Sequence, residues 1–128
     1  MVKGVRSAVD DAFPICKEIA ECDNQIIITS MLKKNESTGW YVKPKTTVPN
    51  EAASNTKIFQ AELVTSIIKE NESYLGKVSY IHVRQELADV ILFPRPAQVV
   101  MCVVVQRPYN LEHLTAKVSD LLDAQLNR

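Results

Sequence analysis

Cysteine and histidine are the residues of this sequence most able to act as nucleophiles or metal ligands. There are three cysteines, Cys16, Cys22 and Cys102, and two histidines, His82 and His113. No Cys-x-x-Cys pair occurs, and a six-residue separation would turn the thiols of Cys16 and Cys22 apart on a short helix. Cys102 lies inside an apolar run, where cysteine usually serves as a small hydrophobic residue. We therefore expect no metal site and no catalytic thiol.

Phosphate binding and carboxylate catalysis find little support in the sequence. Glycine occurs only at positions 4, 39 and 76, so no glycine-rich loop could cradle a phosphate. Glu86 and Asp89 are three residues apart across a turn, and their pattern indicates solvent exposure rather than a carboxyl group with a raised pKa. We predict that the protein is not an enzyme and uses no cofactor.

His82 is the most prominent polar residue of the predicted sheet. It alternates with Tyr80 and Arg84 along one face of a predicted strand. Histidine changes its charge near neutral pH, so His82 could form a pH-sensitive contact with a partner or with a second copy of the chain. It could equally be a half-exposed strand residue without a role, and both interpretations stay open.

Composition and charge narrow the class of protein. Of the 128 residues, 46% are hydrophobic and 23% charged, and 15 basic against 15 acidic residues give no net charge. A nucleic-acid partner is not expected, because phosphate binding requires a basic excess. The apolar runs are too short to span a bilayer and the odd number of cysteines indicates reduced thiols, so we expect a cytoplasmic protein without membrane insertion. We predict one domain over residues 1–128, with residues 1–12 as a loosely ordered or helical extension.

Periodicity predicts three helices and five strands. Pro14 suits the first turn of a helix, and Asn110 is a good N-cap for the last helix. The β-branched run Ile26–Ile28 and the apolar run from Val99 to Gln106 are typical of strands buried on both faces. The expected order is a helix from about Pro14 that ends before Asp23, strands 25–33 and 40–43 joined by a polar turn at 35–39, a helix over 50–71, strands 77–84, 88–93 and 99–106 with turns at 84–86 and 94–96, and a helix after Asn110.

The three predicted helices each carry one apolar stripe. In helix 50–71 the stripe contains Phe59, Leu63 and Ile67, at the spacing i, i+4, i+8. Such helices must bury their stripes against the sheet, so the pattern predicts an α/β sandwich with a mainly antiparallel sheet and helices on both faces.

The sequence resembles the roadblock family of profilin-like folds, and in particular its divergent archaeal members of unassigned role. The resemblance covers the chain from about Pro14 to its end. It rests on the order of the elements, on the stretch from Val78 to Pro94 (VSYIHVRQELADVILFP), on the apolar fifth strand and on the short amphipathic last helix.

The resemblance implies a fold and a type of function. The implied fold is a five-stranded antiparallel sheet in the order 2-1-5-4-3, with the long second helix on one face and the first and last helices on the other. Family members commonly dimerise through the edge third strands and the second helices, and act as scaffolds, adaptors or regulators of small GTPases. We therefore expect a non-catalytic homodimer that binds a small GTPase or another scaffold protein. The candidate dimer contacts are Phe59, Leu63, Ile67, Val78, Tyr80, His82 and Arg84.

Two alternatives remain open. A small-molecule sensor would need polar groups that converge between a helix and the sheet, and its candidates are Thr29, Ser30, Trp40 and Tyr80. A cysteine-dependent enzyme would need the Cys102 thiol to lie beside the His82 ring.

Overall fold

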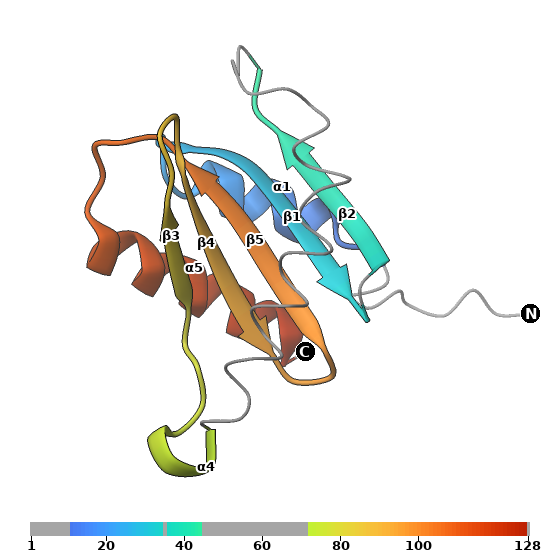
Figure 1. Ribbon diagram of the computed structural model, residues 1–128. Helices are drawn as coiled ribbons and strands as arrows, with labels where there is room; N and C mark the ends of the chain where they lie inside the picture. The colour runs from blue at the N-terminus through green and yellow to red at the C-terminus, as the bar shows by residue number, and fades with distance from the viewer. Residues whose placement is uncertain (1–10, 35, 45–71, 128) are drawn as a thin grey trace, which may run out of the picture.

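The computed structural model describes residues 11–34, 36–44 and 72–127 (Figure 1). Five strands form one sheet in the order β2-β1-β5-β4-β3, and every neighbouring pair is antiparallel. This is the predicted strand order. The predicted helix over residues 50–71, with Phe59, Leu63 and Ile67, lies outside the described residues, as do residues 1–10 of the predicted extension. The elements are α1 (Phe13–Glu21), β1 (Ile26–Lys33), β2 (Glu36–Val42), α4 (Glu72–Leu75), β3 (Ile81–Arg84), β4 (Asp89–Arg95), β5 (Val99–Val105) and α5 (Leu111–Leu126).

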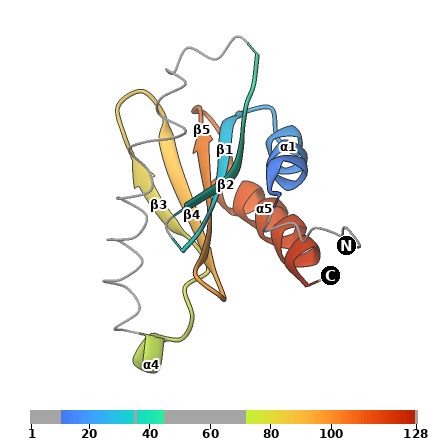
Figure 2. The same cartoon turned by 90° about the vertical axis from the view of Figure 1, so that its right-hand side faces the viewer.

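Helices α1 and α5 cover the same face of the sheet, as Figure 2 shows from the side. Alternate residues of β5 point toward these helices and contact their apolar stripes in the main core. Among the described helices, none is both long enough and apolar enough to cross a membrane. The largest fully buried side chains between the helices and the sheet include Ile15, Ile19, Met101, Phe93, Leu114 and Leu122.

The centre of the opposite face of the sheet is also apolar and buried. Val100, Cys102 and Val104 of β5 point to this face and pack with neighbours on β1 and β4, such as Leu32 and Leu92. Every residue of β5 is buried. The prediction that this strand lies centrally, with both faces covered, is therefore confirmed.

The predicted polar turn at residues 35–39 is wrong, because β2 begins at Glu36. Lys34, with a φ of 50°, lies in the turn that precedes β2. Gly39 lies within the strand and contacts the start of α1. A Cβ atom on Gly39 would lie 2.7 Å from the backbone nitrogen of Phe13, so glycine allows the close approach of this helix to the sheet.

Strand β4 runs through Pro94 and Arg95, where we predicted a turn. Proline cannot donate a hydrogen bond to a strand ladder. It is tolerated here because β3 begins at Ile81, opposite Leu92, so that Pro94 has a strand neighbour only in β5. The turn follows instead at Pro96 to Gln98.

The last helix follows its prediction closely. The Asn110 side chain accepts a hydrogen bond of 2.9 Å from the backbone N–H of His113, which caps the helix as expected. Leu114, Val118 and Leu122 are fully buried on one stripe.

Candidate interaction site at the edge of the sheet

Strand β3 forms one edge of the sheet (Figure 1). Within the described part of the chain it pairs with β4 alone, so its outer N–H and C=O groups face away from the ladder. The strand is short and mostly exposed. We call this outer side of Ile81–Arg84 the β3 edge.

The β3 edge is shorter than the predicted strand over residues 77–84. The ladder with β4 stops at Ile81, because the next residues would have to pair near Pro94, which lacks an N–H. The carbonyl of Ser79 accepts instead from the Arg95 guanidinium at 3.0 Å.

The four described candidate contact residues have different environments. Val78 and Tyr80 precede the strand, and the Tyr80 ring packs on Phe93 in the main core at a centroid distance of 6.2 Å. His82 and Arg84 lie within β3 and pair with Ile91 and Asp89 of β4, on the face that α5 covers. Only the last two therefore belong to the β3 edge as the structure defines it.

A buried carboxylate organises this end of the sheet. Asp89 is only 1% exposed and accepts hydrogen bonds from three side chains. The Tyr109 hydroxyl donates to Oδ2 at 2.6 Å, His82 Nε2 lies 3.1 Å from the same oxygen, and the Arg107 guanidinium donates to Oδ1. The Tyr109 oxygen and His82 Nε2 are 2.9 Å apart. We call these four residues the Asp89 network.

The Asp89 network connects three parts of the chain. His82 lies on β3, Asp89 begins β4, and Arg107 and Tyr109 lie between β5 and α5. Arg107 also donates to the carbonyls of Gln85 and Glu86, at 2.9 and 2.8 Å, in the loop between β3 and β4. The network therefore fixes the position of the edge strand and of its loop relative to the central strand.

The electrostatics of the network favour an ionised Asp89. Burial disfavours its charged form, but hydrogen bonds from Tyr109 and His82 and the positive charge of Arg107 outweigh this effect, so the pKa of Asp89 is lowered from its ordinary value. Burial and the adjacent carboxylate raise the pKa of Tyr109, which therefore remains a hydrogen-bond donor at neutral pH.

The interpretation of Asp89 as a solvated turn residue is thus wrong. The sequence contained a signal, since Asp89, Ile91 and Phe93 alternate along one face of β4 and the last two are core residues. Arg107 and Tyr109 were missed altogether. They follow the end of β5, and the antiparallel register places that end beside the start of β4.

The structure divides the candidate residues of each alternative function between the two faces of the sheet. Cys102 pairs with Leu92 and points to the opposite face from His82, which excludes the Cys–His pair. For the sensor, Thr29 points toward α1 and donates to the Cys16 carbonyl at 2.7 Å. Ser30 points the other way and lies opposite Trp40 on β2, whereas Tyr80 packs on the main core with Thr29, so the four candidates are divided between the two faces of the sheet.

The remaining thiols are in inert surroundings. Cys16 is buried, its thiol donates to the Gly39 carbonyl at 3.6 Å, and burial raises its pKa to about 12. Burial also raises the pKa of Cys22. Within residues 11–34, 36–44 and 72–127, no group of three or more histidine, cysteine or acidic residues could hold a metal ion.

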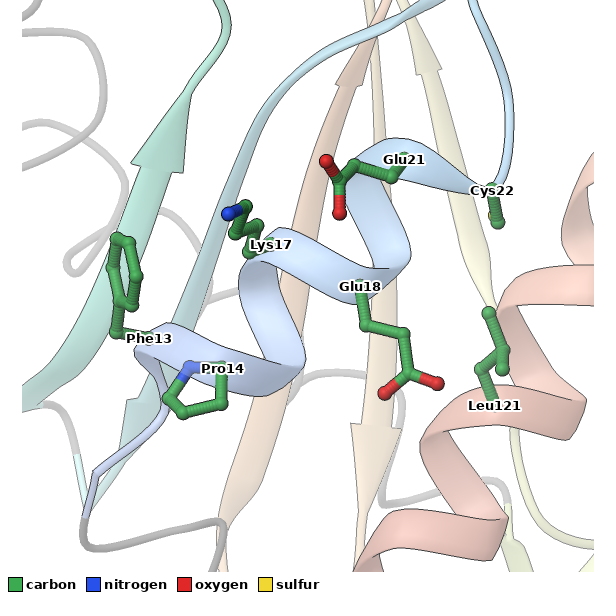
Figure 3. Close-up of a pocket in the computed structure, with 7 residues that line it drawn as sticks. All are labelled: Phe13, Pro14, Lys17, Glu18, Glu21, Cys22 and Leu121. Carbon is green, nitrogen blue, oxygen red and sulfur yellow. The ribbon is translucent and has the colours of Figure 1, made fainter.

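A shallow depression of about 570 Å³ lies between α1 and α5 (Figure 3). Phe13, which is 50% exposed, and Pro14 lie at one end of it, and Leu121 forms the α5 side. Glu18 points toward α5 and accepts a hydrogen bond from Gln125 at 2.7 Å. The depression is open and its polar groups do not converge, so it lacks the features of a small-molecule site.

Comparisons with known proteins support the fold. No family model and no curated protein matches the sequence. The Roadblock/LC7 domain from Streptomyces avermitilis is 10% identical, with a TM-score of 0.72 over 89% of this chain and 93% of that chain. The gliding protein MglB from Thermus thermophilus is 9% identical, with a TM-score of 0.65 over 97% and 94% of the two chains. Myxococcus xanthus MglB is 12% identical, with a TM-score of 0.64 over 96% and 92%. This chain therefore has a roadblock-like fold, as the sequence resemblance implied.

Proposed function

We propose that this domain is a non-catalytic interaction domain that forms a homodimer through the β3 edge and presents the dimer to a small GTPase or another scaffold protein. The observation that carries the proposal is an ordered edge strand whose outer hydrogen-bonding groups have no partner within the described part of the chain. Edge strands of this kind readily pair with a second strand.

The surroundings of the β3 edge favour association. Val83 and Leu87 are large apolar residues that are 38% and 85% exposed on the strand and on the loop that follows it. The Asp89 network holds the strand in place, so little conformational entropy would be lost when a second strand pairs with it.

The comparisons support self-association at a coarse level. One structure with this fold, at 11% identity and a TM-score of 0.65, is described as MglB with a tetrameric arrangement. A small GTPase or scaffold as the further partner follows from the roadblock-like resemblance and remains part of the proposal. We also propose that Phe59, Leu63, Ile67, Val78 and Tyr80 contribute to the dimer contact beside the β3 edge.

Substituting Val83→Lys tests the proposed dimer. The wild-type protein should elute as a dimer whose mass, by size-exclusion chromatography with light scattering, falls only on strong dilution. Lysine on an edge strand opposes strand pairing, and two copies would place like charges near one another, so the dissociation constant should rise by about a hundredfold or more.

Trp40→Lys is the matched control, because Trp40 is a 49% exposed apolar residue on β2, the strand at the opposite edge of the sheet. This variant should remain dimeric. A monomeric wild-type protein would contradict the proposed dimer. A Val83→Lys variant that dimerises as strongly as the wild type would show that the contact does not involve β3. Thermal unfolding of both variants separates a loss of dimer from a loss of fold.

A further inference from the structure

Two-fold symmetry limits how two β3 edges can pair. In an antiparallel ladder, residues directly opposite one another point to the same face of the sheet. In a symmetric pair a residue i is opposite residue j, and j is opposite i. Because i and j must share a face, the difference between their residue numbers is even. One residue of the strand therefore lies directly opposite the same residue of the second copy, at the symmetry axis.

The two registers that use most of Ile81–Arg84 are centred on His82 and on Val83. With the axis at His82, the ring lies opposite His82 of the second copy. With the axis at Val83, it lies opposite Arg84 of the second copy. In either register a protonated His82 faces a cation, at a Cβ separation of roughly 4.5–5.5 Å.

The groups around His82 determine which ring nitrogen carries the hydrogen in the neutral ring and which one accepts the second proton. An ionised Asp89 can only accept hydrogen bonds, so Nε2 carries the hydrogen that points to Oδ2 at 3.1 Å, and a second proton binds Nδ1. The charged and titratable groups on this face are Asp89 from β4, Arg107 and Tyr109 from the segment before α5, and Arg84 from β3 itself.

The charge of this face is already positive when His82 is neutral, and protonation of His82 increases the excess. One carboxylate, Asp89, stands against Arg84, Arg107 and the imidazolium of His82 in each copy. Asp89 keeps its negative charge in mildly acidic solution, because the network lowers its pKa. Two copies would therefore bring an excess of positive charge together across the paired strands.

We infer that His82 makes the β3-edge dimer sensitive to acid: the dimer is stable when the ring is neutral and weakens when His82 gains a proton at Nδ1. This inference rests on the proposed homodimer and concerns its regulation.

The test is the dimer dissociation constant, measured by sedimentation velocity over a dilution series at about pH 8 and about pH 5.5, which span the range in which histidine ordinarily changes charge. For the wild-type protein we expect the constant to rise about tenfold at the lower pH, which corresponds to about 1.4 kcal/mol. His82→Gln keeps a neutral hydrogen-bond donor and should make the constant nearly independent of pH. Arg84→Gln removes the cation that faces His82 in the register centred on Val83, so it should reduce the pH effect in that register.

His113→Gln is the matched control, since the chain has two histidines and His113 lies in the first turn of α5. It should keep the full pH effect. A dimer of equal strength at both pH values overturns the inference and leaves the proposed dimer standing. A pH effect that His113→Gln abolishes and His82→Gln retains also overturns it. A wild-type protein that is monomeric at both pH values removes the proposed function and the inference together. Circular dichroism at each pH verifies that every variant is folded.

Discussion

Asp89 connects β4 to β3 and to the segment before α5 through its hydrogen bonds with His82, Arg107 and Tyr109. Replacing it with asparagine keeps its size but removes the charge that Arg107 and His82 face. We expect Asp89→Asn to lower the free energy of unfolding by about 2–3 kcal/mol, measured by chemical denaturation at pH 7. The loss should be smaller than for a fully buried ion pair, because the Arg107 and His82 side chains are 29% and 27% exposed and regain some hydration.

The same substitution should change the response to acid. A carboxyl group whose pKa is lowered by folding contributes stability above its unfolded pKa, about 3.9 for aspartate, and this contribution is lost as the pH falls through the folded pKa. The difference between wild type and Asp89→Asn should therefore shrink as the pH falls from 5 toward 2. Asp120→Asn, at an exposed position of α5, is the control and should change stability little. An Asp89→Asn variant as stable as this control would contradict a stabilising role for the network.

The sequence pattern is sufficient to assign Asp89 to the buried face of β4, but it does not identify the side chains that bind it. Alternation along β4 assigns Asp89 to the core-facing side, together with Ile91 and Phe93. The identity of its donors depends on the register between β4 and β5, which sets Asp89 opposite Val105. Register follows from the packing of the whole sheet, so the network could not be read from local patterns.

Arg95 connects α5 to the sheet, as the Asp89 network connects β3 to the central strands. At the end of β4 its guanidinium donates to Asp123 Oδ1 at 2.6 Å and to the Ser119 hydroxyl at 3.3 Å on α5, and to the Ser79 carbonyl before β3. Its side chain is 12% exposed, whereas that of Asp123 is 50% exposed. The contacts with Ser79 and Ser119 should therefore outweigh the partly solvated ion pair.

We predict that Arg95→Met lowers the free energy of unfolding by about 1–3 kcal/mol, because it leaves several polar groups without their partner. Asp123→Ala should cost less than about 1 kcal/mol, as exposed ion pairs usually do. A double-mutant cycle in chemical denaturation measures the coupling between the two. A coupling as large as the whole effect of Arg95→Met would show that the ion pair, and not the other contacts, fixes α5.

Elements that bury a continuous apolar pattern were predicted well. Strand β5 and helix α5 agree with their predictions, since the apolar run and the Asn110 cap are local signals. The predictions from the sequence are wrong where one element constrains the conformation or length of another. Gly39 indicated a turn but provides room for α1, and Pro94 indicated the end of β4 but instead limits the length of β3.

The arrangement of the sheet should make the backbone amides of the central strands better protected from hydrogen exchange than those of the edge strands. Strands β1 and β5 lie between paired neighbours, and β5 is buried on both faces. Strands β2 and β3 are the edges. The resemblance predicted the order of the strands, and the apolar run predicted the central position of β5. The function of each edge strand depends on what pairs with it, which the sequence does not indicate.

Amide hydrogen exchange should locate the dimer contact. We expect the amides of β1 and β5 to exchange most slowly, because opening them requires disruption of the core. In the wild-type dimer, β3 amides that point outward should be protected by the second copy, whereas in monomeric Val83→Lys they should exchange quickly. Protection in β5 should be nearly the same in both proteins, which controls for a general loss of stability. Equal exchange of the β3 amides in wild type and variant would show that β3 is not covered in the dimer, and that the protein associates through another surface.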